Sequence, residues 1–269
     1  MSLNIIESLP AENTLVLYHS KPKYKREGVK YFSSTELSKI PKVDVVFIIS
    51  AFIPEPGRNL NSEKELFDVN VEFIKTITTH FKFSRLVFAS SVSIYNADSG
   101  SIICENSEIS PATPYAISKL WGESIVKEAK SYAILRISSL IGKGAKEQTF
   151  VPIVIKNAIQ NKTITLFGQG ERKQNYINYY DAAQMFIRAS ELSGNGIYLA
   201  VGTKSFSNRE VAEIIKNILP GTIINYQNED TSPSYNYNAA KTYEALNYTP
   251  LRSLTDSITE IITWKKEQF

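Results

Sequence analysis

Apolar and polar residues alternate along this chain in blocks that predict strands followed by helices. Short apolar runs are typical of parallel strands buried on both faces, and apolar residues recurring every three or four positions are typical of helices that cover a sheet. The predicted strands cover 14–20, 28–33, 43–52, 85–91, 132–140, 164–172 and 195–201. The predicted helices cover 2–9 (with Ser2 as N-cap), 62–80, 114–130, 151–162, 179–192, 207–219 and 254–267.

This order of elements predicts an α/β protein with a Rossmann-like, doubly wound parallel sheet. The pattern becomes less regular after about residue 140, so a smaller C-terminal lobe is expected to close over the sheet edge. We expect residues 1–140 and 176–203 to form the Rossmann-like domain, and 141–175 and 204–269 to form the lobe. Ligands of such sheets bind beyond the carboxyl ends of the strands, where Ser50, Ser91 and Ser138–Ser139 are placed.

Composition excludes several other classes of protein. The 269 residues include 30 Lys and Arg and 27 Asp and Glu, and the net charge of +3 gives no reason to expect a nucleic-acid partner. One cysteine, Cys104, excludes an intramolecular disulfide and a cysteine-based zinc site, and two histidines do not favour a metal centre. No apolar run reaches the roughly 20 residues of a membrane span, and no signal peptide is evident. A cytoplasmic protein without a membrane segment is therefore expected.

The chemistry is expected between residues 85 and 119. The apolar run 86–89 ends in Ser90 and Ser91, and Tyr115 and Lys119 follow, four positions apart on one face of a predicted helix. A tyrosine is a poor base at its usual pKa of about 10, and a protonated lysine nearby would lower that pKa. An isolated YxxxK pair is more often an ordinary surface feature, but a strand-end serine upstream of it favours a proton-transfer set.

Several stretches together resemble the extended short-chain dehydrogenase/reductase family, in its NAD(P)-dependent nucleotide-sugar epimerase/dehydratase group. The resemblance covers nearly the whole chain, and the order of its motifs is more specific than any single match. The matching stretches are VDVVFIISA, LFDVNVEFIKTI, RLVFASSVSIYN, PYAISKLWGE, ILRISSLIGKG and FGQGERKQNYINYYDAA.

The resemblance implies an NAD(P)-dependent nucleotide-sugar epimerase or reductase that transfers a hydride at a sugar carbon. It implies catalytic roles for Ser91, Tyr115 and Lys119, with the tyrosine as acid and base. The cofactor contacts that it implies are Ser50, Ala51, Asn70, Ala89, Tyr115 and Lys119, and the substrate contacts are Ser91, Ser93, Ser139, Arg172 and Gln174. It also implies a nucleotide-sugar substrate, no metal, and a homodimer formed through helices near 62–80 and 112–130.

The chain departs from the family pattern at the expected cofactor site. No glycine precedes Gly28, so the first strand and the GxxGxxG turn of the family are absent, either by truncation or by divergence. We therefore expect a gap in the sheet beside strand 43–52, filled by the N-terminal segment, by a neighbouring chain, or left exposed. The acidic residue that would hold the ribose of NAD is replaced by Tyr18, His19 and Ser20. The cations that follow, Lys21, Lys23, Lys25 and Arg26, would favour NADP, although a solvated basic turn explains them equally well.

Other departures concern the reaction. Val92 and Ser93 replace the Asp-Glu pair of the dehydratases, which argues against 4,6-dehydration, and Ser93 also replaces a cysteine acid of a reductase branch. Ser139 replaces a family asparagine, and Gln174 replaces a phosphate-binding arginine for which Arg172 could substitute. C4 epimerisation or ketone reduction remains the expected reaction. The alternative is a non-catalytic or cofactor-impaired relative that binds a nucleotide sugar or a partner subunit.

Overall fold

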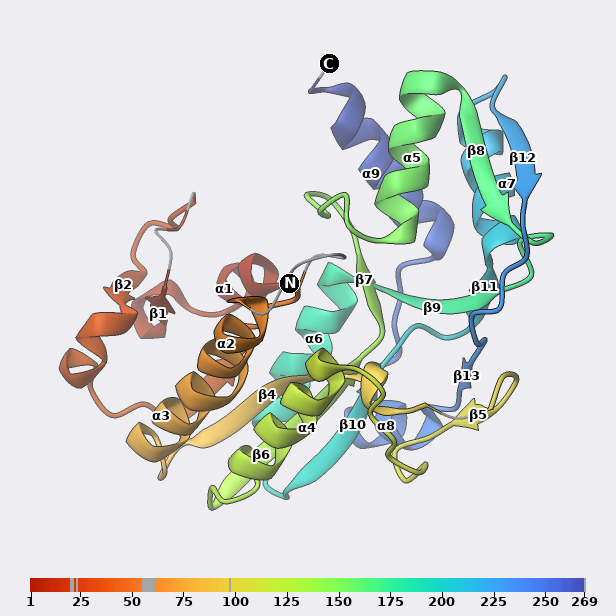
Figure 1. The fold of residues 1–269 in the computed structure, drawn as a ribbon. Coiled ribbons are helices and arrows are strands. Elements are labelled where there is room, and N and C mark those ends of the chain that lie inside the picture. Colours follow the sequence, from red (N-terminus) through yellow and green to blue (C-terminus); the bar gives the residue numbers. More distant parts are fainter. Residues whose placement is uncertain (20–21, 23, 55–60, 97, 269) are drawn as a thin grey trace.

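The sheet that organises the molecule has four parallel strands in the order β10-β6-β4-β3 (Figure 1). The structure is a computed structural model that describes residues 1–19, 22, 24–54, 61–96 and 98–268. The four strands are β3 (Val45–Ile48), β4 (Arg85–Ser91), β6 (Ser131–Ile137) and β10 (Gly196–Ala200). The predicted α/β fold with parallel strands is confirmed.

Helices cover both faces of this sheet because side chains along each strand alternate between the two faces. Leu86 and Phe88 of β4 enter the core on the side of α3 and α4, whereas Val87 and Ala89 enter the core on the side of α1 and α6. The helices are α1 (Ser2–Ser8), α2 (Asn61–Phe67), α3 (Phe73–His80), α4 (Pro114–Val126) and α6 (Tyr179–Glu191). The sheet is therefore doubly wound, as predicted.

A second core lies in the C-terminal part of the chain, where α5, α7 and α9 pack around short strands (Figure 1). The remaining helices are α5 (Phe150–Asn161), α7 (Asn208–Ile218), α8 (Ala240–Ala245), which packs outside this core, and α9 (Leu254–Lys266). The short strands after residue 100 that lie outside the main sheet are β5 (Ile102–Ile103), β7 (Ser139–Ile141), β8 (Thr163–Phe167), β9 (Lys173–Asn178), β11 (Ser205–Ser207), β12 (Ile223–Gln227) and β13 (Asn236–Tyr237). β7, β9 and β11 form one small sheet, β8 pairs with β12, and β5 pairs with β13. The domain boundaries proposed from the sequence stay a prediction.

The sheet is interrupted beside β3, as expected. β1 (Leu15–Tyr18) and β2 (Lys30–Ser33) form a separate parallel pair, and β3 is the last strand of the four-stranded sheet. In the described ranges, residues before β1 form α1 and a short turn, not a strand. Ile5 of α1 packs into the core to which Val45 and Phe47 of β3 also contribute. The N-terminal segment thus covers one face of the sheet beside the interruption without completing it.

Three local predictions were wrong, each for a physical reason. The strand expected at 132–140 divides at Ser138, where the chain leaves the main sheet and joins β9 as β7. The run 43–52 forms only a four-residue strand and is partly exposed, because it lies at a sheet edge. Met1, not Ser2, is the N-cap of α1, and it makes no side-chain capping bond.

Among the described helices, none has both the length and the apolar character that a membrane span requires.

Candidate active site

The predicted proton-transfer residues meet at the carboxyl end of β4. Ser91 ends the buried strand, and its hydroxyl accepts a hydrogen bond from Ser93 N at 3.1 Å at the start of a short 3-10 turn. Thr113 begins α4, because its hydroxyl accepts from Ala116 N at 3.1 Å and Pro114 occupies the first turn. This cap places Tyr115 in the first turn of the helix, at the same sheet edge as Ser91.

Tyr115 lies beside Ser91, whose hydroxyl is near enough to act on the pKa of the tyrosine, so two of the predicted residues meet. Burial raises the pKa of Tyr115 to about 12, and the Ser91 hydroxyl opposes that rise only in part. The sequence predicted that Lys119 lowers this pKa, but burial and Ser91 are the causes of the shift, and Lys119 is not one of them. The tyrosine is therefore a protonated hydroxyl, able to donate, in the structure as it stands.

Lys119 lies one helical turn after Tyr115 and is completely enclosed. Its Nζ donates a hydrogen bond to the Ala89 carbonyl at 2.8 Å and lies 6.0 Å from the centroid of the Tyr115 ring. Burial lowers the pKa of Lys119 to about 8, and the charge of Glu123 opposes that lowering. An ammonium has three N–H donors, and only one finds an acceptor among the described residues. Two donors therefore remain for a ligand hydroxyl.

Asn70, which the resemblance implies as a cofactor contact, has its side-chain amide bonded within the protein. It is buried in a π-helical turn, Asp68–Glu72, between α2 and α3. Its amide accepts from Phe52 N at 2.8 Å and donates to Phe52 O at 2.9 Å and to Ser118 Oγ at 3.0 Å. Asn70 thus fastens the loop after β3 to α4. Ser50 and Ala51 are exposed in that same loop.

A buried ion pair lies directly beneath the catalytic residues. Arg136 on β6 forms a two-pronged bond with Glu123 on α4, at 2.9 Å from Nε and 2.8 Å from the second amino group. Ser90 donates to the same carboxylate at 2.6 Å. Burial alone would lower the pKa of Arg136, but its hydrogen bonds to Glu123 and the charge of that carboxylate raise it. The prediction missed these three residues, although a lone arginine within an apolar strand was a visible signal.

The predicted substrate residues come from several elements. The Ser93 hydroxyl is buried without a hydrogen-bond partner in the described chain. Ser139 begins β7, opposite Tyr176, and the Gln174 amide donates to Asn208 at 3.1 Å. Arg172 lines a pocket of about 380 Å³ in the C-terminal part. The predicted substrate set is therefore spread over the turn after β4, the β7 and β9 strands and this pocket.

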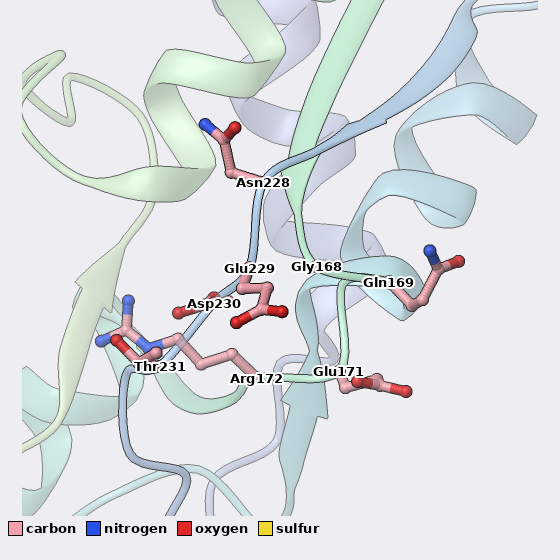
Figure 2. A pocket seen from close by; sticks show the side chains of 8 residues that line it. All are labelled: Gly168, Gln169, Glu171, Arg172, Asn228, Glu229, Asp230 and Thr231. Carbon is pink, nitrogen blue, oxygen red and sulfur yellow. The ribbon is translucent and has the colours of Figure 1, made fainter.

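The pocket lies between the turn after β8 and the segment after β12. Its lining residues are Gly168, Gln169, Glu171, Arg172, Asn228, Glu229, Asp230 and Thr231. Figure 2 shows Arg172 extending toward Thr231, with Glu229 and Asp230 beside it. The buried Nε of Arg172 has no hydrogen-bond partner among the described residues. Gly170 shapes the turn, since its φ of +71° and its closeness to Arg209 N leave little room for a side chain.

The two described cations of the basic turn after β1 contact the protein itself. Arg26 donates to the carbonyls of Ile6 and Leu9 at the end of α1, the latter at 2.7 Å. Lys25 lies over the Tyr31 ring at 5.1 Å. Lys21 and Lys23, together with Ser20, lie outside the described residues. Arg26 is therefore not free to hold the additional phosphate of NADP.

The site fits one end of a nicotinamide dinucleotide. The two uncommitted donors of Lys119 and the Tyr115–Ser91 hydroxyl pair suit a ribose and a reacting oxygen at the strand end. In the described part, the β1–β2 pair is not hydrogen-bonded to the edge strand β3 of the main sheet. Named residues are therefore assigned to the nicotinamide end of the dinucleotide and not to its pyrophosphate end.

Comparison with known proteins gives a consistent result. The model of the NAD dependent epimerase/dehydratase family matches residues 11–201. A putative UDP-glucose 4-epimerase of Methanocaldococcus jannaschii is 26% identical over 244 residues, 85% of this chain and 79% of that protein. The UDP-N-acetylglucosamine 4-epimerase of Methanobrevibacter ruminantium M1, solved with UDP-N-acetylmuramic acid, has a TM-score of 0.87 at 18% identity and covers 99% of this chain and 94% of its own. MoeE5, solved with UDP-glucose and NAD, has a TM-score of 0.82 at 17% identity, with 99% and 95% covered.

Proposed function

Because the chain belongs to the NAD dependent epimerase/dehydratase family, we propose that it is an NAD-dependent nucleotide-sugar epimerase acting at C4. The observation that carries the proposal is the pair of neighbouring hydroxyls of Ser91 and Tyr115, with the buried Lys119 one helical turn away. The 4-epimerase names of a relative and of a similar structure support the choice of carbon. The commitment of Arg26 to α1 supports NAD over NADP.

The residues divide the proton chemistry among them. NAD, when bound, would accept the hydride from the sugar carbon and return it. Tyr115, in its tyrosinate form, takes the proton from the sugar hydroxyl as that carbon is oxidised, and returns it when the carbon is reduced again. Ser91 donates a hydrogen bond to the same sugar oxygen and orients Tyr115. Lys119 keeps a positive charge beneath the tyrosine, which stabilises the tyrosinate once a ligand excludes water.

The substrate would extend from the end of β4 toward the lobe. The unpartnered hydroxyl of Ser93 lies two residues beyond Ser91 and suits a sugar hydroxyl. Arg172 is the cation available to a diphosphate in the pocket shown in Figure 2. Three carboxylates, Glu171, Glu229 and Asp230, line that pocket as well. Binding of an anionic nucleotide there is therefore expected to weaken at low ionic strength, where the repulsion by these carboxylates is less screened.

We also propose a homodimer through α2 and α4. Phe67 and Trp121 contact each other edge to face at 5.4 Å on these neighbouring helices, and Trp121 and Ile117 remain 51% and 50% exposed. Exposed aromatic and aliphatic side chains grouped in this way are typical of a protein interface.

Calorimetric titration with NAD, NADP and UDP-glucose, followed by proton NMR of UDP-glucose incubated with the enzyme and NAD, tests the proposal. We expect micromolar binding of NAD, weaker binding of NADP, and appearance of the C4 epimer. Reduction of a 4-keto sugar without epimerisation would assign the reductase reaction instead. Absence of NAD binding up to millimolar concentration, together with absence of turnover, would contradict the proposal and favour a non-catalytic relative.

A further inference from the structure

The Glu123–Arg136 pair has no role in the proton transfer described above, yet it is deeply buried. Both side chains are at most 1% exposed. Burying two charges costs several kcal/mol in desolvation, and apolar residues of similar volume often serve stability as well or better. Stability alone therefore does not account for the pair.

We propose that Glu123 and Arg136 are positioning residues for the catalytic site, which balance the charge of Lys119 and hold the end of β4 in place. The inference rests on the proposed function, since it assigns a purpose to the protonated Lys119. Its geometric basis is independent of any ligand, because every contact lies within the chain.

The pair acts first on the charge of Lys119. Glu123 follows Lys119 by four residues on α4, so the two side chains lie on the same face of the helix. The charge of Glu123 favours the protonated form of Lys119, and Arg136 donates to both oxygens of the Glu123 carboxylate. Lys127 approaches that carboxylate to 3.9 Å at the protein surface.

The other surroundings of Lys119 are neutral. β4 presents the Ala89 carbonyl and the ring of Phe88, and the first turn of α4 presents Tyr115. The helices packed against α4 present the amide of Asn70, bonded to Ser118. Glu123 is therefore the group whose charge decides the protonation of Lys119.

The second contact of the pair is with the strand that carries Ser91. Ser90 donates to Glu123 at 2.6 Å, and its neighbour Ser91, the last residue of the strand, lies beside Tyr115 of the same helix. Because Ser90 and Ser91 are adjacent residues of one strand, holding Ser90 in place also holds the backbone that carries Ser91. Arg136 also donates to the Tyr95 hydroxyl and, at 3.1 Å, to the Glu105 carbonyl, which holds the chain that follows β4.

The third contact reaches the C-terminal part of the chain. The carboxylate of Glu105 accepts a hydrogen bond from Thr242 of α8 at 2.6 Å, and Thr242 also accepts from Leu199 N at 2.8 Å. The contacts therefore run without interruption from the catalytic helix, through Arg136 and the Glu105 segment, to α8. A displacement of Arg136 would disturb the catalytic residues and this junction together.

The test uses two variants that remove opposite halves of the pair, Glu123→Gln and Arg136→Met. The pKa of Lys119 is measured from the Cε chemical shift of protein labelled with carbon-13 lysine, with Lys119→Met identifying the signal. Loss of the carboxylate should lower this pKa by about one unit or more, and loss of the guanidinium should raise it by a similar amount. The high-pH limit of turnover should move in the same two directions.

If the pair were only structural, both variants would lose stability, but the pKa of Lys119 would not fall in one variant and rise in the other. Movement in the same direction, or no movement, would overturn the inference. The double variant Glu123→Gln/Arg136→Met leaves no lone buried charge, so it is expected to fold even where a single variant does not. Its Lys119 pKa should lie below that of the wild type and above that of Glu123→Gln, and an unchanged value would also overturn the inference.

The titration of Lys119 needs no substrate, so it separates this inference from the proposed function. If the protein converts no nucleotide sugar but the two variants shift the pKa of Lys119 in opposite directions, the positioning inference stands and the proposed reaction is contradicted. Ser90→Ala serves as a matched control, because it removes a hydrogen bond to Glu123 without changing a charge. It should lower turnover and leave the pKa of Lys119 within about 0.3 units of the wild type, well under the shift that a full charge produces.

Discussion

Lys119 illustrates how a single residue combines a cost in stability with a use in chemistry. Its ammonium is fully enclosed, and one carbonyl is its hydrogen-bond acceptor in the described chain. Burial disfavours the charged form, which is why its pKa falls to about 8 from the usual value of a lysine. Because this pKa is close to neutral pH, Lys119 changes its protonation state in response to small changes around it, such as a bound ribose or the charge of Glu123.

Lys119→Met is expected to change stability in a pH-dependent way. Between pH 8 and 10.5 the unfolded lysine is protonated and the folded one is not, so the stability of the wild type rises with pH in that window. Below pH 8 the wild type carries the full cost of the buried charge, at most about 3 kcal/mol. The variant should therefore be more stable than the wild type at pH 7, by a margin that shrinks toward pH 10.5.

Urea unfolding of both proteins from pH 7 to 10.5 measures that margin. A difference in unfolding free energy that is independent of pH, or that grows with pH, would show that Lys119 is not desolvated as described.

The residues of the site could be predicted from the sequence where neighbouring residues in the chain determine their positions. The strand-end position of Ser91 and the helical spacing of Tyr115 and Lys119 follow from adjacent sequence, and the structure brings all three together. Glu123 and Arg136 were missed because their partnership depends on the packing of α4 against β6, which no local pattern reveals.

At the scale of elements, the sequence predicted which segments form strands and helices more accurately than the residues at which these elements begin and end. Residues 85–91 form β4 as predicted, because an uninterrupted apolar run suits a central strand. Residues 43–52 have the same apolar character, but they are partly exposed because β3 is an edge strand with only β4 beside it in the sheet. The composition of a strand does not indicate whether it lies at an edge. The division at Ser138 likewise depends on β7 pairing with β9.

Arg26 is expected to hold the β1–β2 pair against α1. Its guanidinium donates to two carbonyls at the end of that helix, where a cation is also favoured by the helix dipole. Arg26→Met should lower the free energy of unfolding by about 1–2 kcal/mol, since charged hydrogen bonds are lost. It should also speed hydrogen exchange in residues 15–18 and 30–33.

Lys25→Met is the matched control for Arg26. Lys25 is exposed and contacts only the ring of Tyr31 among the described residues, an interaction worth about 0.5 kcal/mol at the surface. Equal losses of stability in the two variants would contradict a special role for Arg26.

At the scale of the whole molecule, the exposed apolar side chains on α2 and α4 predict self-association. Trp121→Glu places a charge in the centre of this surface and should convert a dimer to a monomer in light scattering or sedimentation. Ile223→Glu, at a position 59% exposed on β12, is the control and should leave the mass unchanged. A wild-type monomer, or dissociation by both variants alike, would exclude this interface.

The central claim is that Tyr115 carries the proton in a nucleotide-sugar reaction, and Tyr115→Phe tests it most directly. The change removes one oxygen atom and leaves the packing of the ring unaltered, so binding of NAD and UDP-glucose should persist. Turnover followed by proton NMR should fall by about 10²–10⁴-fold, the usual contribution of a positioned acid and base. Turnover equal to that of the wild type would contradict the account.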